Sequence, residues 1–303
     1  MVNHSHPDPL HWQSKVVLLL VVPWTVASAL LQAHWWATQM PQVAWQTIGI
    51  SVAFGLIVWK LRAATPAAAA TGAVITASLI FANASAYLAN PYSTGWLRTG
   101  LSPLLAVFLL TFIATKIGKA QKARLGTAES KRGRNAAQVS ANLGAAALLV
   151  SFESLLGWEH FGETPNLGCI LALSALAEAA ADTVSSEIGQ VLGGQPRMLT
   201  TLRRVPPGTD GGVTFAGTLA GIAAAMIVAA IGSWALGEDW LVWIVCVAGA
   251  TLGLFFDSLL GATLERRGRL NNDAVNFLST LSAPVFSVLV MIGWYFLLAK
   301  RIR

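Results

Sequence analysis

The residues best suited to chemistry lie between positions 178 and 217. Here an otherwise apolar helical run carries three acids, which are Glu178, Asp182 and Glu187. A basic loop follows and leads into the glycine-rich turn GTDGG at 208–212, which contains Asp210. Ionisable groups inside a membrane are costly and usually line a functional cavity. Carboxylates, arginines and backbone amides together indicate a metal-bound phosphate ligand.

Polar residues from other predicted helices are expected at the same membrane depth. Residues spaced by three or four positions share one helix face, and several such polar faces point toward one membrane surface. These residues are Asn142, Asp210, Asp257, Asn272 and Asn276. Magnesium prefers oxygen ligands and takes one or two carboxylates plus substrate phosphates. The sequence therefore predicts Asp182, Glu187 and Asp257 as Mg²⁺ ligands, whereas Glu178 is equally compatible with a structural role.

The loop after these acids is suited to bind phosphates. The GTDGG turn offers backbone N–H groups at the predicted start of a helix, and its glycines allow close approach of a phosphate. Arg203 and Arg204, with Asp182, form the predicted catalytic set, because arginines offset charge on a transferring group. The chain has no GxxxxGK[ST] loop and no HRD or DFG signature. It is therefore not a standard soluble nucleotide-binding fold.

The elements that must position these residues are transmembrane helices. Of the 303 residues, 55% are hydrophobic and 11% are charged, whereas soluble domains carry about 25% charged residues. The chain is therefore predicted to be an all-α, polytopic integral membrane helix bundle of about nine segments. The predicted spans are 15–36, 42–61, 66–89, 100–118, 137–157, 166–193, 211–236, 239–263 and 274–299. The net charge of +6 fits short basic loops at a membrane surface rather than nucleic-acid binding.

Loop charge predicts the orientation of the chain. The loops at 119–134, 195–210 and 265–270 are basic, and the alternate loops are acidic. The positive-inside rule then places the basic loops, the N-terminal tail 1–14 and the site on the cytoplasmic side of a cytoplasmic or plastid-type membrane. The 119–134 run is interpreted mostly as a solvated loop. Nine spans would leave the basic C-terminus outside, so either a span is miscounted or the polar segment 271–284 is re-entrant.

Acidic residues divide the predicted single membrane domain, 15–303, into two zones. There is no Asp or Glu between Pro9 and Ala128. The spans within 15–118 are therefore expected to act as scaffold, and 119–299 is expected to be the catalytic half.

Four strings in this second half carry a family resemblance. ADTVSSEIG, RRVPPGTDGGVTFAGTLAG, DSLLGATLE and NNDAVNFLST, in this order, resemble the transmembrane-protein-19-like family, also known as domain of unknown function 92. The resemblance covers about residues 40–299. The residues that match its motifs are Asp182, Ser186, Glu187, Gly208, Asp210, Gly211, Gly212, Asp257, Gly261, Asn272 and Asn276. Asp210 departs from the Asn expected in many relatives and adds negative charge.

The resemblance implies a function for these residues. The best-understood branch of the family includes the phytyl-phosphate kinase of the vitamin E pathway, and the family is distantly similar to CTP-dependent polyprenol kinases. The implied activity converts an isoprenyl monophosphate, such as phytyl or geranylgeranyl phosphate, to the diphosphate with CTP or another nucleoside triphosphate and Mg²⁺. The implied nucleotide and phosphate contacts are Ser186, Gly208, Asp210, Gly211, Gly212, Asn272 and Asn276, to which Asn142 is added from its position.

Three alternatives to this kinase are considered. A cytidylyltransferase that makes a CDP-lipid needs the same metal and triphosphate site. A transporter would carry polar residues through the whole membrane depth, whereas the external halves of the last spans are nearly featureless. A purely structural protein would not need clustered acids. The absence of histidine beside the acids favours a phosphate acceptor, which ionises without a general base.

Overall fold

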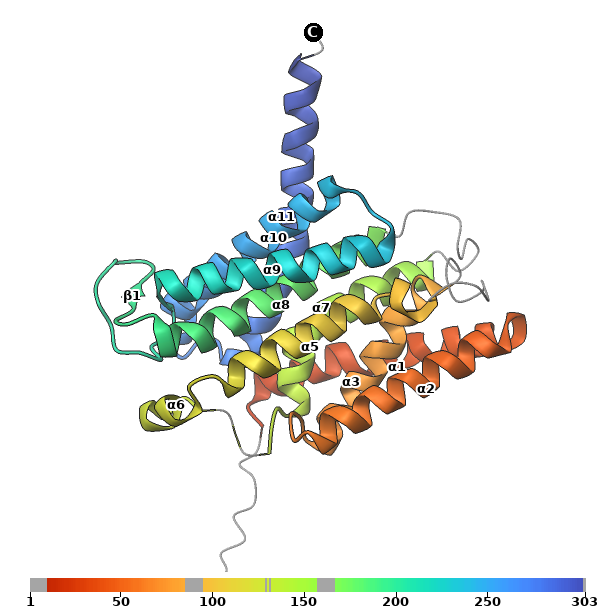
Figure 1. Ribbon diagram of the computed structural model, residues 1–303, viewed down its shortest axis with the longest axis horizontal. Helices are drawn as coiled ribbons and strands as arrows, with labels where there is room; N and C mark the ends of the chain where they lie inside the picture. The colour runs from red at the N-terminus through yellow and green to blue at the C-terminus, as the bar shows by residue number, and fades with distance from the viewer. Residues whose placement is uncertain (1–9, 85–94, 129, 131, 157–166, 302–303) are drawn as a thin grey trace, which may run out of the picture.

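The computed structural model describes residues 10–84, 95–128, 130, 132–156 and 167–301, and this part of the chain is almost entirely helical (Figure 1). The helices are α1 (Trp12–Gln39), α2 (Pro41–Lys60), α3 (Pro66–Phe81), η1 (Gly95–Arg98), α5 (Leu101–Lys116), α6 (Lys119–Leu125), α7 (Ala136–Leu156), α8 (Leu167–Leu192), α9 (Phe215–Leu236), α10 (Trp240–Leu260), the π-helical turn η3 (Gly261–Glu265) and α11 (Asn272–Arg301). Strand β1 (Arg197–Met198) pairs with β2 (Gly212–Val213) in a small antiparallel hairpin.

The prediction of an all-α polytopic membrane protein is confirmed, and each predicted span overlaps a helix. Residues 85–89, 157 and 166, at the ends of three predicted spans, lie outside the described residues. Six helices are long and apolar enough to cross a membrane, or seven if the bent pair α5 and α6 forms one span. Helices α3 and α7 are apolar but shorter in their described parts. The count of nine is therefore an approximation. The segment 271–284 does not form a re-entrant loop, because α11 continues through Pro284.

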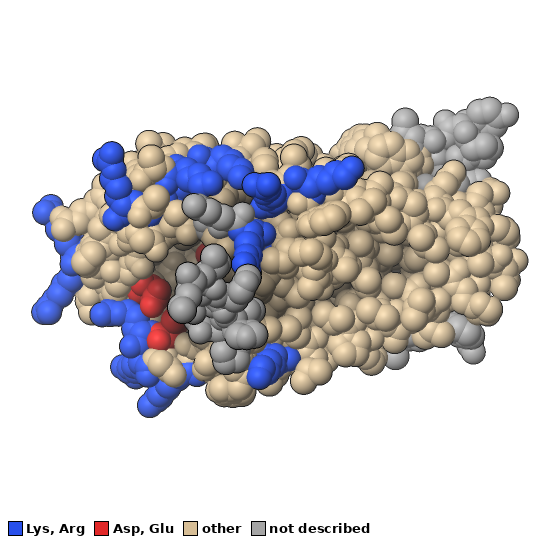
Figure 2. Space-filling model, turned by 90° about the horizontal axis from the view of Figure 1, so that it is seen from below, with Lys and Arg blue, Asp and Glu red and all other residues tan. Residues whose placement is uncertain are grey.

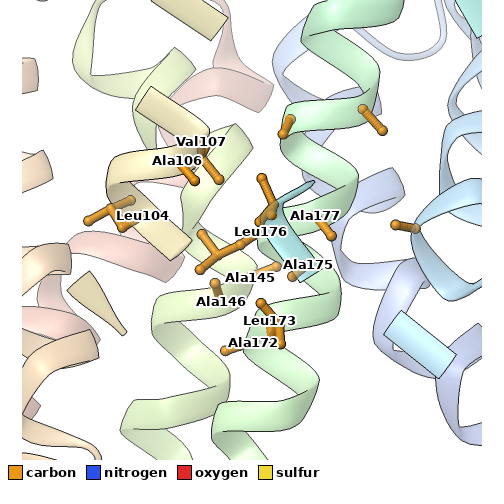
Figure 3. Close-up of a cluster of buried hydrophobic side chains, with 14 of the residues drawn as sticks. Leu104, Ala106, Val107, Ala145, Ala146, Ala172, Leu173, Ala175, Leu176 and Ala177 are labelled. Atoms are coloured by element: carbon orange, nitrogen blue, oxygen red, sulfur yellow. The ribbon is translucent and has the colours of Figure 1, made fainter. Parts of the chain in front are cut away.

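Helix α8 is the centre of the bundle. In its most apolar stretch 78% of the residues are buried, against 28% for α1 and α2. The core between α5, α7 and α8 is rich in alanine, which allows helices to approach closely. Figure 3 shows this cluster, which includes Leu104, Ala106, Val107, Ala145, Ala146, Ala172, Leu173, Ala175, Leu176 and Ala177.

The contact between α8 and α9 depends on glycine. A Cβ atom at Gly217 would lie 2.6 Å from the carbonyl oxygen of Ser185, and one at Gly221 would lie 2.7 Å from that of Ala181. The two backbones can approach this closely only because both residues lack a side chain. This close approach fixes α9 against the part of α8 that carries the acids.

Charged residues gather at one end of the molecule. Figure 2 shows lysines and arginines around the end that carries α6 and the β-hairpin, with acidic side chains exposed between them. The start of α1 is tied to this end as well, since Gln13 donates to the carbonyl oxygen of Arg269 and Ser14 donates to Asp273. Helix α11 lies across the other helices, and its C-terminal part projects beyond them (Figure 1).

Candidate functional site

The structure brings three carboxylates together inside the bundle. Glu178 and Asp182 lie one helical turn apart on α8, and Asp257 comes from α10. All three interact electrostatically. Glu178 is fully buried, and among the described residues neither of its carboxylate oxygens has a hydrogen-bond partner. One oxygen of Asp257, Oδ2, is likewise buried without a partner in the described part of the chain.

The hydroxyl group of Ser279 on α11 interacts with both Glu178 and Asp257. Its hydrogen bond, however, goes to the carbonyl oxygen of Asn276 at 3.0 Å. A buried polar group without a partner costs about 1–3 kcal/mol, and more if it is charged. Glu178 and Asp257 therefore keep buried oxygens that no donor among the described residues satisfies, as expected for groups that bind a cation or a polar ligand.

Further charges surround the three carboxylates at the polar end of the bundle. Asp210 and Glu265 interact electrostatically with Asp257 from the loop and from the π-helical turn. Arg134 interacts with Asp182, and its guanidinium group lies 3.5 Å from the hydroxyl of Thr183. Acids and a cation thus lie side by side where α7, α8 and α10 meet.

The glycine-rich turn closes over the end of α10. Gly211 has a φ of +72°, and a Cβ atom there would collide with the backbone of Ala262. Met198 of β1 is buried beneath the loop, and the side chain of Arg266 reaches its sulfur atom at 3.7 Å. The loop is therefore packed on the protein rather than free in solvent, and glycine at position 211 is required for this packing.

The predicted position of this turn at a helix start is wrong. Helix α9 begins at Phe215, where the hydroxyl of Thr214 accepts a hydrogen bond from the backbone N–H of Gly217 at 3.1 Å. The predicted span began at 211 because the apolar run extends to that point, but the glycines preceding Thr214 form a hairpin instead. The backbone N–H of Gly212 donates to the carbonyl oxygen of Thr209 at 2.9 Å, and the turn has no support from a helix dipole.

The other predicted phosphate contacts lie at the rim. Arg203, Arg204, Gly208, Asp210, Ser186 and Asn272 are exposed, and Gly212 is half-buried in β2. Asn142 is buried, and its side-chain oxygen lies 3.5 Å from the side-chain nitrogen of Asn276. The two asparagines thus link α7 to α11 beside the acids. The roles assigned to all these residues remain predictions.

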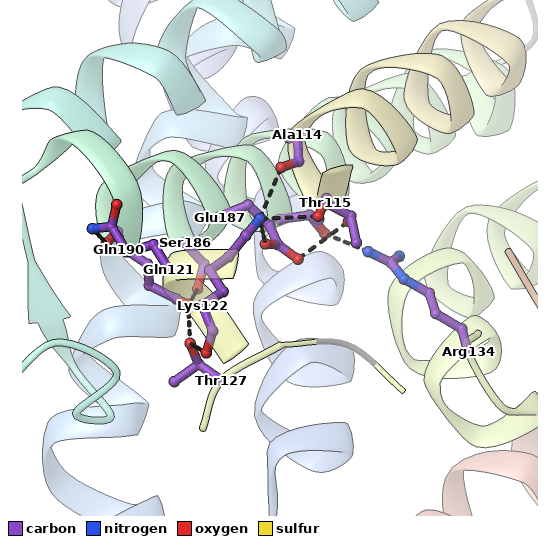
Figure 4. A network of polar contacts seen from close by, with 10 residues as sticks. Ala114, Thr115, Gln121, Lys122, Thr127, Arg134, Ser186, Glu187 and Gln190 are labelled. Carbon is purple, nitrogen blue, oxygen red and sulfur yellow. Dashed lines mark hydrogen bonds and ion pairs between the residues drawn. The ribbon is translucent and has the colours of Figure 1, made fainter. Parts of the chain in front are cut away.

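Glu187 lies apart from the three carboxylates. Its carboxylate accepts hydrogen bonds from Lys122 Nζ at 2.5 Å and from the hydroxyl of Thr115 at 3.1 Å (Figure 4). Five positions along an α-helix correspond to a rotation of about 140° from Asp182, whereas four positions from Glu178 to Asp182 correspond to about 40°. Helical geometry therefore groups Glu178, rather than Glu187, with Asp182.

Lys122 is the residue that the sequence interpretation missed. It is 1% exposed, although the run 119–134 was expected to be mostly a solvated loop. Its ammonium group donates to the carbonyl oxygens of Ala114 and Thr115, each at 3.0 Å, and to Glu187. The bend of 68° between α5 and α6 folds Lys122 back against the end of α8. The sequence signals this buried contact only by a lysine near Gly118, a residue at which the chain can turn.

The oxygen donors suit a hard cation that also binds phosphate. Within the described residues no group of three or more His, Cys, Asp or Glu side chains is arranged to hold a metal ion alone. Magnesium usually takes only one or two carboxylates and completes its coordination with water and substrate phosphates. Asp182 and Asp257 fit that requirement, and the buried unpartnered oxygen of Asp257 provides an unused acceptor.

The fold and this site define a class of protein, namely a polytopic α-helical membrane protein with acids buried at one polar end. The chain belongs to the family described as integral membrane protein DUF92, which matches residues 49–284.

Relatives of known sequence occur in archaea, plants and cyanobacteria. The chain is 34% identical over 188 residues to the uncharacterized membrane protein MJ0933 of Methanocaldococcus jannaschii, which covers 62% of this chain and 74% of that protein. It is 30% identical over 196 residues to the chloroplastic protein VTE6 of Arabidopsis thaliana, which covers 63% of this chain and 58% of VTE6. It is 30% identical to the uncharacterized membrane protein sll0875 of Synechocystis over 64% of this chain and 74% of that protein. No solved structure matches the chain.

Proposed function

We propose that this chain is an integral-membrane prenyl-phosphate kinase, which transfers the γ-phosphate of CTP or another nucleoside triphosphate to an isoprenyl monophosphate. The observation that carries the proposal is the group of carboxylates Glu178, Asp182 and Asp257 beside Arg134. Glu178 and Asp257 keep buried oxygens that have no partner among the described residues. The similarity to VTE6 and the family's phytyl-phosphate kinase branch support the choice of lipid.

Asp182 and Asp257 would hold Mg²⁺, which neutralises charge on the phosphates when it is bound. Glu178 lies deepest and would set the negative potential that makes the site select a cation. Arg134 would contact the acceptor phosphate, because it already lies beside Asp182. Arg203 and Arg204 are exposed on the loop and would bind the nucleotide phosphates from the solvent side.

The reaction needs positioning more than proton transfer. An ionised oxygen of the prenyl phosphate forms the new bond to the γ-phosphorus, while the bond from that phosphorus to the β–γ bridging oxygen breaks and its electron pair leaves with the nucleoside diphosphate. A phosphate monoester is largely ionised near neutral pH, so no residue must remove a proton. Arginines and a low-dielectric surrounding stabilise the charge that spreads over the transferring group.

Radiolabel transfer tests this proposal. Purified protein with Mg²⁺ and geranylgeranyl phosphate should place label from γ-labelled CTP, and none from α-labelled CTP, on the lipid. Asp182→Asn and Asp257→Asn should each lower turnover at least about a hundredfold, which corresponds to about 2.7 kcal/mol. Glu238→Gln is the matched control, since Glu238 follows α9 at the other end of the bundle.

Three outcomes would contradict the proposal. Label from the α-position in the lipid would identify a cytidylyltransferase. Full activity in a chelator would exclude the divalent cation. Wild-type turnover in both aspartate variants would remove the carboxylates from the reaction.

A further inference from the structure

A groove with apolar walls and a basic mouth lies between α2, α3, α5 and α7. Its walls include Phe54 and Val58 of α2, Gly72 of α3 and Leu104 and Val107 of α5. Its mouth carries cationic side chains, which are Arg62, Lys116, Lys119, Lys122 and Arg134. Among its described lining residues none is an Asp or Glu. These walls belong to the spans that the sequence suggested were scaffold.

The mouth of the groove is held in place by backbone contacts. The backbone N–H of Arg134 donates to the carbonyl oxygen of Ala63, and its carbonyl oxygen accepts from the N–H of Thr65. The segment between α2 and α3 is thereby fixed to the start of α7. Arg62 in this segment has a φ of +55°, a left-handed conformation that is uncommon and strained for a residue other than glycine. Such strain concentrates at binding sites.

The inner side of the mouth adjoins the carboxylates. Arg134 lines the groove and also interacts with Asp182. Ala179, the residue next to Glu178 on α8, lines the groove too, as does Asn142, which contacts Asn276. A phosphate at the mouth would therefore lie between the basic side chains and the site of transfer.

We infer that this groove binds the acceptor lipid, with a single isoprenoid chain along the apolar walls and the monophosphate at the mouth; this inference rests on the proposed function. Charge complementarity selects an anionic headgroup, because the mouth is lined by cations and by no acid among the described residues. Lys122 is paired with Glu187 and Arg134 interacts with Asp182, whereas Arg62, Lys116 and Lys119 form no ion pair within the described part of the chain. The axis of α5 rises about 16 Å between Thr115 and Leu104 at ~1.5 Å per residue. The groove encloses about 120 Å³, which suits part of one chain rather than the two chains of a phospholipid.

Gly72 offers a way to fill the groove without disturbing the helix. It lines the groove, and a Cβ atom there would meet nothing within 4 Å in the described structure. Leucine is also a better helix former than glycine. Gly49 of α2 is the matched control, since a Cβ atom there also meets nothing within 4 Å, and the residue is exposed and outside the groove.

The test measures binding of tritiated geranylgeranyl phosphate to the full chain in nanodiscs, without nucleotide. Gly72→Leu should weaken binding at least about tenfold, and Gly49→Leu should remain within about twofold of the wild-type protein. Gly72→Leu should lower the affinity for geranyl phosphate, whose chain is shorter, by less than about threefold. A general loss of structure would not produce this difference between the two lipids. Unlabelled phosphatidic acid and inorganic phosphate should compete poorly.

A second variant tests the basic mouth of the groove and leaves its apolar walls unchanged. Lys116 is exposed and lies 4.9 Å from the ring of Phe112, so Lys116→Gln is expected to fold. It should lower the affinity for geranylgeranyl phosphate about fivefold and leave the affinity for geranylgeraniol unchanged. The matched control is Arg124→Gln, because Arg124 is exposed on α6 and does not line the groove.

The outcomes separate this inference from the proposed function. Wild-type binding by Gly72→Leu, equal losses in Gly49→Leu, or stronger competition by phosphatidic acid would overturn the groove assignment. If the wild-type protein binds geranylgeranyl phosphate in the groove but transfers no γ-phosphate, the result contradicts the proposed kinase function and supports the lipid site. If the wild-type protein transfers phosphate while the Gly72→Leu protein binds geranylgeranyl phosphate normally, the result contradicts only the groove assignment.

Discussion

The ion pair between Lys122 and Glu187 provides a test of how the polar end is held together. The side chain of Lys122 is 2% exposed and that of Glu187 is 15% exposed. All three protons of the ammonium group have acceptors, in Glu187 and in two backbone carbonyl groups at the end of α5. Removal of one partner from a buried ion pair costs about 3–5 kcal/mol, because it leaves an uncompensated charge.

The two single substitutions should not have equal effects. Glu187→Gln leaves the ammonium group of Lys122, the more buried charge, unpaired. It should lower the free energy of unfolding by about 4 kcal/mol. Lys122→Met leaves a carboxylate that is partly exposed and still accepts a hydrogen bond from Thr115, so it should cost about 2 kcal/mol. The double substitution Lys122→Met with Glu187→Gln should lower the free energy of unfolding by only about 3 kcal/mol, which gives a coupling free energy of about 3 kcal/mol.

Unfolding in mixed detergent and dodecyl sulfate micelles, followed by circular dichroism, measures these free energies. Reaction of a thiol-reactive fluorophore with Cys169 and Cys246, which are both buried, provides a second readout of the same transition. Arg124→Met is the control on the same helix, since Arg124 is exposed and its loss should cost less than about 0.5 kcal/mol. A Glu187→Gln protein with wild-type stability that has lost its magnesium dependence would refute the reasoning and identify Glu187 as a metal ligand.

Other predictions concern the carboxylates, the loop and the orientation of the chain. Glu178→Met should raise the free energy of unfolding by about 1–2 kcal/mol, because it removes a buried acid without partners, and should lower turnover about a hundredfold; a less stable, fully active protein would contradict this. Gly211→Ala should lower the free energy of unfolding by about 2 kcal/mol because of its left-handed backbone and its contact with Ala262 of η3, and faster hydrogen exchange in the hairpin would report it. Arg124→Cys and Glu238→Cys should react with an impermeant maleimide from opposite sides of the membrane, and reaction from one side would refute the orientation.

The helices could be predicted from the sequence because each depends on local hydropathy. Runs of apolar residues mark the spans wherever the helix lies in the bundle. The same signal placed the start of α9 too early, since glycines and a valine before Thr214 continue the apolar run without continuing the helix. The capping hydroxyl of Thr214 and the positive φ of Gly211 mark the boundary between the hairpin and the helix.

The candidate site could be predicted only in part. Asp182 and Asp257 were identified from their types and positions, and the structure places them together. The relation of Glu178 to Asp182 was visible in the four-residue spacing, but burial of its carboxylate without a partner depends on α10 and α11. The burial of Lys122 and the groove proposed to bind the lipid could not be predicted, because both arise where helices distant in the sequence pack together.

The energetic cost of Glu178 connects the fold to the proposed function. Packing alone would be served better by an apolar side chain, since a fully buried acid without a partner among the described residues opposes folding. The bundle holds this acid by surrounding it with close contacts, and a Cβ atom at Gly253 would lie 2.7 Å from the Glu178 side chain. A cation bound to the neighbouring aspartates would remove most of that cost. Binding of the metal and the two phosphate substrates should therefore stabilise the protein against unfolding, and each ligand should strengthen the binding of the others.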